Sequence, residues 1–148
     1  MRVYIDTSVI GGYFDEEFEE WTIKLFKEFE KRTKIPVVSD LTIQELENAP
    51  KHIMTFFESI KTERILLDTE SIQLARNYIK EKAITAKSFN DALHIATATV
   101  NRLDVLVSWN FKHIVNLDRI RLYNAVNLKN GYPLMEIRTP REILTKNE

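Results

Sequence analysis

The sequence predicts an α/β protein built on a central parallel β-sheet of four to five strands. Short apolar, β-branched runs alternate along the 148 residues with longer segments whose apolar side chains recur at helical spacing. Such alternation is typical of a parallel sheet with helices on both faces. Gly and Pro are scarce, at three and four residues, and no linker or repeat divides the chain. We therefore expect one domain over residues 1–148.

Five short segments have the composition of strands. Each is rich in apolar or β-branched residues, and the fourth is almost wholly apolar, as expected for a central parallel strand. Pro36 is tolerated because it stands at the entry of its strand. In chain order the expected strands are 2–5, 36–39, 64–67, 104–108 and 134–137.

The segments between these strands carry apolar residues at helical spacing. Asp40 is expected to cap the second helix and Pro50 to begin the third, whereas Gly11 and Gly12 predict a turn. In chain order the expected helices are 16–32, 40–47, 50–60, 69–82 and 88–101, with further helical material at 111–128.

The composition excludes several classes of protein. Cysteine is absent, which rules out disulfides and thiolate metal sites. No apolar run approaches the ~20 residues that cross a bilayer, and the first residues lack the apolar core of a secretory signal. We therefore expect a cytoplasmic protein without membrane contact.

The charge is small overall but unevenly distributed. The net charge of −1 argues against a protein that grips long nucleic acid by bulk electrostatics. Residues 1–74 carry 9 Lys and Arg against 15 Asp and Glu, and residues 75–148 carry 12 against 7. A metal-dependent nuclease would need such an acidic edge beside a basic flank, but solvated helix faces would give the same count.

Asp6 directly follows the first expected strand, in VYIDTS at residues 3–8. The carboxyl ends of parallel strands are where α/β sheets hold their ligands, so this carboxylate is a candidate catalytic or metal-binding group. The alternative is structural, because an Asp at this point also makes a good N-cap for a following helix.

Glu45 lies in SDLTIQEL at residues 39–46. With Thr42 it has the spacing of a capping box, which would make it structural. Ser39 or Asp40 is better placed as the cap, and Glu45 would then lie in the second turn, near the edge of the sheet. The residues alone leave both interpretations open.

Asp91 lies in SFNDALHIATA at residues 88–98. Ser88 and Asp91 also match a capping box, and an acid in a first turn suits the helix dipole. Small residues at 92, 96 and 99 would however let this helix lie close to the sheet, with Asp91 directed at its carboxyl edge. An inward acid without a partner is unusual, so a functional role is favoured.

Asn110 and the histidines are weaker candidates. Asn110 follows the fourth strand, where its amide oxygen is a candidate additional metal ligand or the cap of the next segment. The three histidines show no zinc-binding spacing. His94 falls three residues after Asp91, close to the acids, and is expected to be structural.

Three converging carboxylates favour a hard divalent cation, because oxygen ligands select Mg²⁺ or Mn²⁺ over zinc. A divalent ion in such a place indicates phosphate chemistry. We expect Asp6 and Asp91 to bind the ion directly or through water. Glu45 is expected to complete the acidic set and to orient or deprotonate the attacking water.

The segments around Asp6, Glu45, Asp91 and Asn110 together resemble the PIN domain family, in the family's order and over essentially the whole chain. The resemblance implies a PIN-like three-layer α/β/α sandwich and a metal-dependent endonuclease acting on RNA. It implies that Asp6, Glu45 and Asp91 surround Mg²⁺ or Mn²⁺. Many members have a fourth acid where this chain has Asn110, so we expect one ion to be held more readily than two.

Small single-domain members of this family are similar to VapC-type toxins of toxin–antitoxin pairs. That likeness implies an antitoxin protein as partner and a homodimer. Aromatic-rich segments around 14–29 and 53–60 would offer a groove for an antitoxin helix or a self-pairing surface, although core packing is the simpler explanation of each aromatic residue. The alternative function is a catalytically weakened PIN-like domain that only binds RNA or protein.

Overall fold

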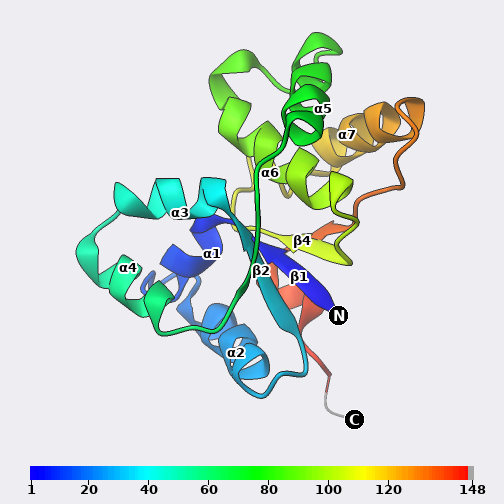
Figure 1. Cartoon of the computed structure of the whole chain (residues 1–148). Coiled ribbons are helices and arrows are strands. Elements are labelled where there is room, and N and C mark those ends of the chain that lie inside the picture. The colour runs from blue at the N-terminus through cyan, green and yellow to red at the C-terminus, as the bar shows by residue number, and fades with distance from the viewer. Residues whose placement is uncertain (147–148) are drawn as a thin grey trace.

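A five-stranded, wholly parallel sheet forms the middle layer of the molecule (Figure 1). The computed structural model describes residues 1–146. Its strands lie in the order β3-β2-β1-β4-β5, which confirms the expected class and strand number. Their bounds are β1 (Arg2–Ile5), β2 (Ile35–Ser39), β3 (Glu63–Ile65), β4 (Val105–Val107) and β5 (Ile137–Arg138).

β1 is the central strand of the sheet. Tyr4 lies opposite Val37 of β2 on one side and Leu106 of β4 on the other. Successive side chains of a strand point to opposite faces, so Tyr4 joins one core while Val3 and Ile5 join the other. Because β1 ends in the middle of the carboxyl edge, the next residue lies at the centre of that edge.

Helices cover both faces of the sheet and complete three α/β/α layers (Figure 1). One core lies under α5 (Thr69–Lys80), α6 (Phe89–Val100) and α7 (Leu117–Lys129). The other lies under α1 (Thr7–Gly12), α2 (Glu19–Glu30) and α4 (Lys51–Glu58). The remaining elements are α3 (Asp40–Glu47) and the short 3-10 helices η1 (Ala86–Ser88) and η2 (Pro140–Ile143). In residues 1–146 we find no helix with the length and apolar character needed to cross a membrane.

The turn expected at Gly11 and Gly12 is wrong, because these residues end helix α1. The Asp6 side chain caps this helix by accepting from the Val9 backbone N–H at 3.2 Å. Gly12 is buried against Trp109, and a Cβ added to it would lie 2.8 Å from the indole. Glycine is present here because of this close packing and not because of a turn.

Several expected boundaries also shift. The helical material expected from residue 111 begins only at Leu117, where the Asn116 side chain caps α7, and residues 111–116 form turns and irregular backbone. The helix expected at 16–32 is shortened at both ends. Asp40 is not a cap: it is the first residue of α3, and its carboxylate binds Arg64 and the Leu67 backbone N–H.

Candidate active site

Asp6, Glu45 and Asp91 come from three elements that meet at the carboxyl edge of the sheet. Asp6 follows β1, Glu45 lies in α3 directly after β2, and Asp91 lies in the first turn of α6. Burial raises the pKa of Asp91, the charges of Asp6 and Glu45 raise it further, and His94 and His113 oppose them. Residues distant in sequence therefore lie within electrostatic reach of one another.

Asp6 is almost fully buried and strongly hydrogen-bonded. Ser8 Oγ donates to Oδ1 and Ser108 Oγ donates to Oδ2, both at 2.6 Å. Burial raises the pKa of Asp6, against the opposing effects of His94, the two serines and Val9. The structural alternative is realised, since Asp6 caps α1. A carboxylate offers about four lone-pair sites, and these three donors leave one free, on Oδ2.

Glu45 lies in the second turn of α3 and takes no part in capping it. The N-cap residue is Ser39, so the capping box with Thr42 is not formed. Thr7 Oγ1 donates to Glu45 Oε1 at 2.6 Å, and His94 Nε2 approaches the same oxygen at 2.6 Å. Burial alone would raise the pKa of Glu45, but the hydrogen bond and charge of His94 hold it below its usual value.

Asp91 is half-buried and differs from the other two acids in its partners. Ser88 is the N-cap residue of α6, but its side chain makes no capping bond, so the capping box that was the structural alternative for Asp91 is not formed. The Asp91 carboxylate forms no hydrogen bond or ion pair with any residue between 1 and 146. Both of its oxygens remain available to a ligand.

His94 is the site residue whose importance the sequence did not reveal. It is 2% exposed, its Nε2 contacts Glu45, and its Nδ1 lies 2.6 Å from the Tyr4 hydroxyl. Its charge lowers the pKa of all three acids. Its i, i+3 spacing from Asp91 was the available signal, because residues three apart share a helix face.

Asn110 occupies the position expected from the sequence, beyond the end of β4. Its Oδ1 accepts hydrogen bonds from the backbone N–H groups of Lys112 and His113, at 3.2 and 2.9 Å. The amide oxygen thus stabilises the turn that follows. A role as an additional metal ligand stays a prediction.

The donor set fits a hard cation by its chemistry. Within residues 1–146, no group of three or more His, Cys, Asp or Glu side chains is disposed to hold a metal ion as it stands. Asp6 Oδ2 and both oxygens of Asp91 nevertheless keep lone pairs that no donor among residues 1–146 occupies, and Thr7 and His94 both contact Oε1 of Glu45 rather than Oε2. The side chain of Asn90 also interacts with the Glu45 carboxylate. Oxygen donors of this kind suit Mg²⁺ or Mn²⁺. Burial is the main cause that raises the pKa of Asp6 and of Asp91, and the charges of Asp6 and Glu45 add to the rise at Asp91.

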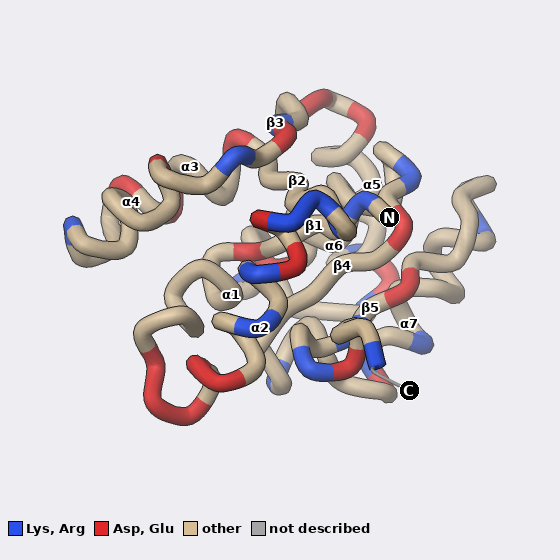
Figure 2. The backbone as a smooth tube through the Cα atoms, turned by 90° about the horizontal axis from the view of Figure 1, so that it is seen from below, with Lys and Arg blue, Asp and Glu red and all other residues tan. Residues whose placement is uncertain are grey.

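Most of the acidic excess of residues 1–74 lies outside the group formed by Asp6, Glu45 and Asp91. Figure 2 shows a run of acidic residues on the loop that enters α2 and on the first turn of that helix. It consists of five exposed side chains, Asp15, Glu16, Glu17, Glu19 and Glu20. The unequal charge of the two halves is therefore largely a solvated surface, as the simpler interpretation held.

Comparison with known proteins agrees with the fold. A family model described as the PIN domain matches residues 3–114, a range that includes Asp6, Glu45, Asp91 and Asn110. No curated protein sequence matches. The chain is similar in structure to a chain from the crystal structure of VapBC2 from Rickettsia felis bound to a DNA fragment from their promoter. The TM-score is 0.63, with 15% sequence identity over 94% of this chain and 98% of that one. This protein belongs to the PIN domain family.

Proposed function

We propose that this protein is a ribonuclease that hydrolyses internal phosphodiester bonds of RNA with Mg²⁺ or Mn²⁺. The observation that carries the proposal is the meeting of Asp6, Glu45 and Asp91 at the carboxyl edge of the sheet in a PIN domain. This edge is where open α/β sheets hold their ligands. An acid whose pKa is raised by burial and by neighbouring charges, as at Asp91, is a frequent mark of a functional site.

The three acids would hold the ion and divide the remaining work. A bound divalent cation supplies Lewis-acid activation of a phosphodiester and of water. Asp6 is held rigidly by Ser8 and Ser108, so it would fix the position of the cation. Glu45 stays ionised at neutral pH because its pKa is lowered, and an ionised carboxylate can orient water and accept its proton. Asp91, which has no protein partner, would complete the set.

The test is cleavage of a labelled RNA by the purified protein with and without Mn²⁺. Glu45→Gln should lower the rate by about 10²–10⁴-fold, the contribution of a general base, and Asp6→Ala should abolish cleavage. Asp118→Asn is the matched control, because Asp118 is an exposed acid on α7. RNA binding without cleavage by the wild-type chain would establish instead the weakened, binding-only PIN-like domain.

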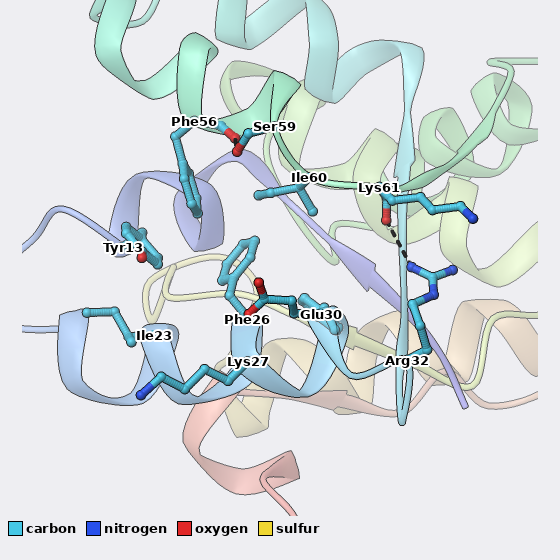
Figure 3. Close-up of a pocket in the computed structure, with 11 residues that line it drawn as sticks. Tyr13, Ile23, Phe26, Lys27, Glu30, Arg32, Phe56, Ser59, Ile60 and Lys61 are labelled. Carbon is cyan, nitrogen blue, oxygen red and sulfur yellow. Dashed lines mark hydrogen bonds between the residues drawn. The ribbon is translucent and has the colours of Figure 1, made fainter.

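We further propose that the protein is a VapC-like toxin that acts in the cytoplasm and is inhibited by an antitoxin. The similarity in fold to a VapBC2 chain supports this, and so does a groove of about 390 Å³ between α2 and α4 (Figure 3). Tyr13 and Phe56 stack in it with ring centroids 4.0 Å apart, beside Phe26. Lys27, Arg32 and Lys61 also line it, against one acid, Glu30.

A groove of this kind suits an amphipathic helix with acidic residues beside its apolar face. The natural partner to test is the product of a short reading frame next to this gene. Its co-expression should relieve growth arrest caused by the wild-type chain. Phe56→Arg should escape that relief while cleaving RNA as before, with an unchanged melting temperature as the control for folding. The family likeness also implies a homodimer, which sedimentation equilibrium would detect as twice the 17.4 kDa chain mass.

A further inference from the structure

A buried chain of hydrogen bonds leads from the core of the sheet to Glu45. Ser39 Oγ and the Tyr4 hydroxyl lie 2.8 Å apart, and the Tyr4 hydroxyl lies 2.6 Å from His94 Nδ1. His94 Nε2 then contacts Glu45 Oε1 at 2.6 Å. Ser39, Tyr4 and His94 are each at most 2% exposed, so solvent does not compete for these bonds.

The chemistry of the groups fixes the direction of the bond to Glu45. An ionised carboxylate only accepts hydrogen bonds, so Nε2 of His94 must carry a hydrogen and donate it. In a neutral ring the other nitrogen then has a bare lone pair and the Tyr4 hydroxyl donates to Nδ1, whereas in a charged ring Nδ1–H donates to the Tyr4 oxygen. The same hydroxyl oxygen accepts from Ser39. Both ring nitrogens of His94 and the Tyr4 hydroxyl have partners in this arrangement.

His94 also connects the elements that carry two of the acids. It lies on α6, one turn after Asp91, and binds Glu45 on α3. Thr7, from α1, contacts the same oxygen of Glu45. Two donors on Oε1 restrict the rotation of the carboxylate, and the Asn90 side chain interacts with the same group.

We propose that His94 is a positioning residue of the ribonuclease, which holds the Glu45 carboxylate through Nε2–H while Tyr4 fixes the imidazole ring from Nδ1. This inference rests on the proposed function, since Glu45 is the group expected to orient the attacking water. His94 itself touches neither substrate nor cation in this role. Residues that orient metal-binding or catalytic groups in this way typically contribute 10–100-fold to affinity or activity.

Two amide variants separate the two ring nitrogens. The side-chain NH₂ of His94→Gln reaches the place of Nε2, and that of His94→Asn reaches only the place of Nδ1. We expect His94→Gln to keep kcat within about threefold of wild type, and His94→Asn to lose about 10–100-fold in kcat with little change in KM. Equal kcat values for the two variants, with folding verified by circular dichroism, would overturn the proposal.

A second measurement does not depend on cleavage. In ¹⁵N-histidine NMR of the metal-free protein, Nε2 of His94 should carry a proton, and Tyr4→Phe should raise the share of rings protonated only at Nδ1. A wild-type ring protonated at Nδ1 and bare at Nε2 would overturn the proposal in an active enzyme. An Nε2–H signal in a wild-type chain that cleaves no RNA would overturn the proposed function and leave the hydrogen-bond chain standing.

Discussion

The fold disfavours the ionised forms of both Asp6 and Asp91. Hydrogen bonds stabilise the charge of Asp6 far more than that of Asp91. Burial raises the pKa of each. Asp6 receives three hydrogen bonds from Ser8, Val9 and Ser108, which stabilise its charge. Asp91 receives none from residues 1–146 and lies among other acids, so its charge is the one that a bound cation would compensate most directly.

Removing the charge of Asp91 should therefore stabilise the metal-free protein. After allowance for solvent screening of a half-exposed group, Asp91→Asn should add about 0.5–1 kcal/mol, or about 2 °C in Tm, while abolishing RNA cleavage. The pKa of Asp91 is raised in the folded protein. The folded chain therefore binds a proton at Asp91 more readily than the unfolded chain does, and the contribution of Asp91 to the free energy of unfolding falls as the pH rises.

The pH dependence of that difference is a second check on Asp91. The advantage of Asp91→Asn should be absent at low pH, where both side chains are neutral. It should grow from the ordinary Asp pKa up to the raised folded value and stay constant above it. Calorimetric scans of both proteins from pH 4 to pH 8 measure it. A lower Tm for the variant at every pH would show that Asp91 acts as a structural cap.

At the scale of single residues, the sequence predicted the three acids but not the side chains that form hydrogen bonds with them. Asp6 and Glu45 were found because each follows a strand, and strand ends converge in a parallel sheet. The bonds from Ser108 to Asp6 and from His94 to Glu45 join residues 102 and 49 positions apart. Spacing along a chain shows which face of an element a residue occupies, but not which distant side chain it meets.

Helix α1 is the element that the sequence concealed. Its six residues are too few to display a helical period, and its two glycines have low helix propensity. Its stability comes from contacts with the rest of the protein. The Asp6 side chain caps the helix, and Val9 and Ile10 are buried in the core. Residues 111–116 were wrongly expected to be helical because their apolar residues continue the spacing of α7. In the structure, the side chains of Asn110 and Asn116 stabilise local turns there instead.

The two glycines of α1 give a matched pair of substitutions. Gly12→Ala places a Cβ 2.8 Å from Trp109 and 3.0 Å from Thr22 Oγ1, and Trp109 Nε1 donates to that same oxygen. Overpacking of this kind should cost about 1–3 kcal/mol. Gly11→Ala meets nothing within 4 Å and should stabilise by about 0.5–1 kcal/mol through helix propensity. Urea unfolding of both variants measures the difference, and equal midpoints would contradict the packing described here.

At the scale of the whole molecule, a cation that binds only the folded site must stabilise the fold. At Mn²⁺ concentrations 100 times the dissociation constant, the gain is about 2.7 kcal/mol, or about 5–10 °C in Tm for a chain of this size. Asp6→Ala should lose most of that shift, and Asp118→Asn should keep it. A wild-type melting curve unchanged by millimolar Mn²⁺ would count against a metal site.

The overall architecture was the most predictable level. Alternating elements determine a parallel sheet with covered faces, and the apolar residues of β1 and β4 mark them as buried strands. The order of the strands was less accessible, because Tyr4 and Leu106 become neighbours only through a crossover between segments far apart in the chain. Which strands become neighbours depends on how the connecting helices pack on the sheet, and the composition of the segments does not reveal that packing.

The strand order has a consequence for translation. β1 is made first, yet it receives its second neighbour only when β4 arrives, about a hundred residues later. Ser108, which binds Asp6, leaves the ribosome in the same stretch. A growing polypeptide thus lacks Asp91 until α6 has emerged from the exit tunnel, and it lacks the Ser108 bond to Asp6 until β4 has followed, so the site cannot assemble before about two thirds of the chain has been made.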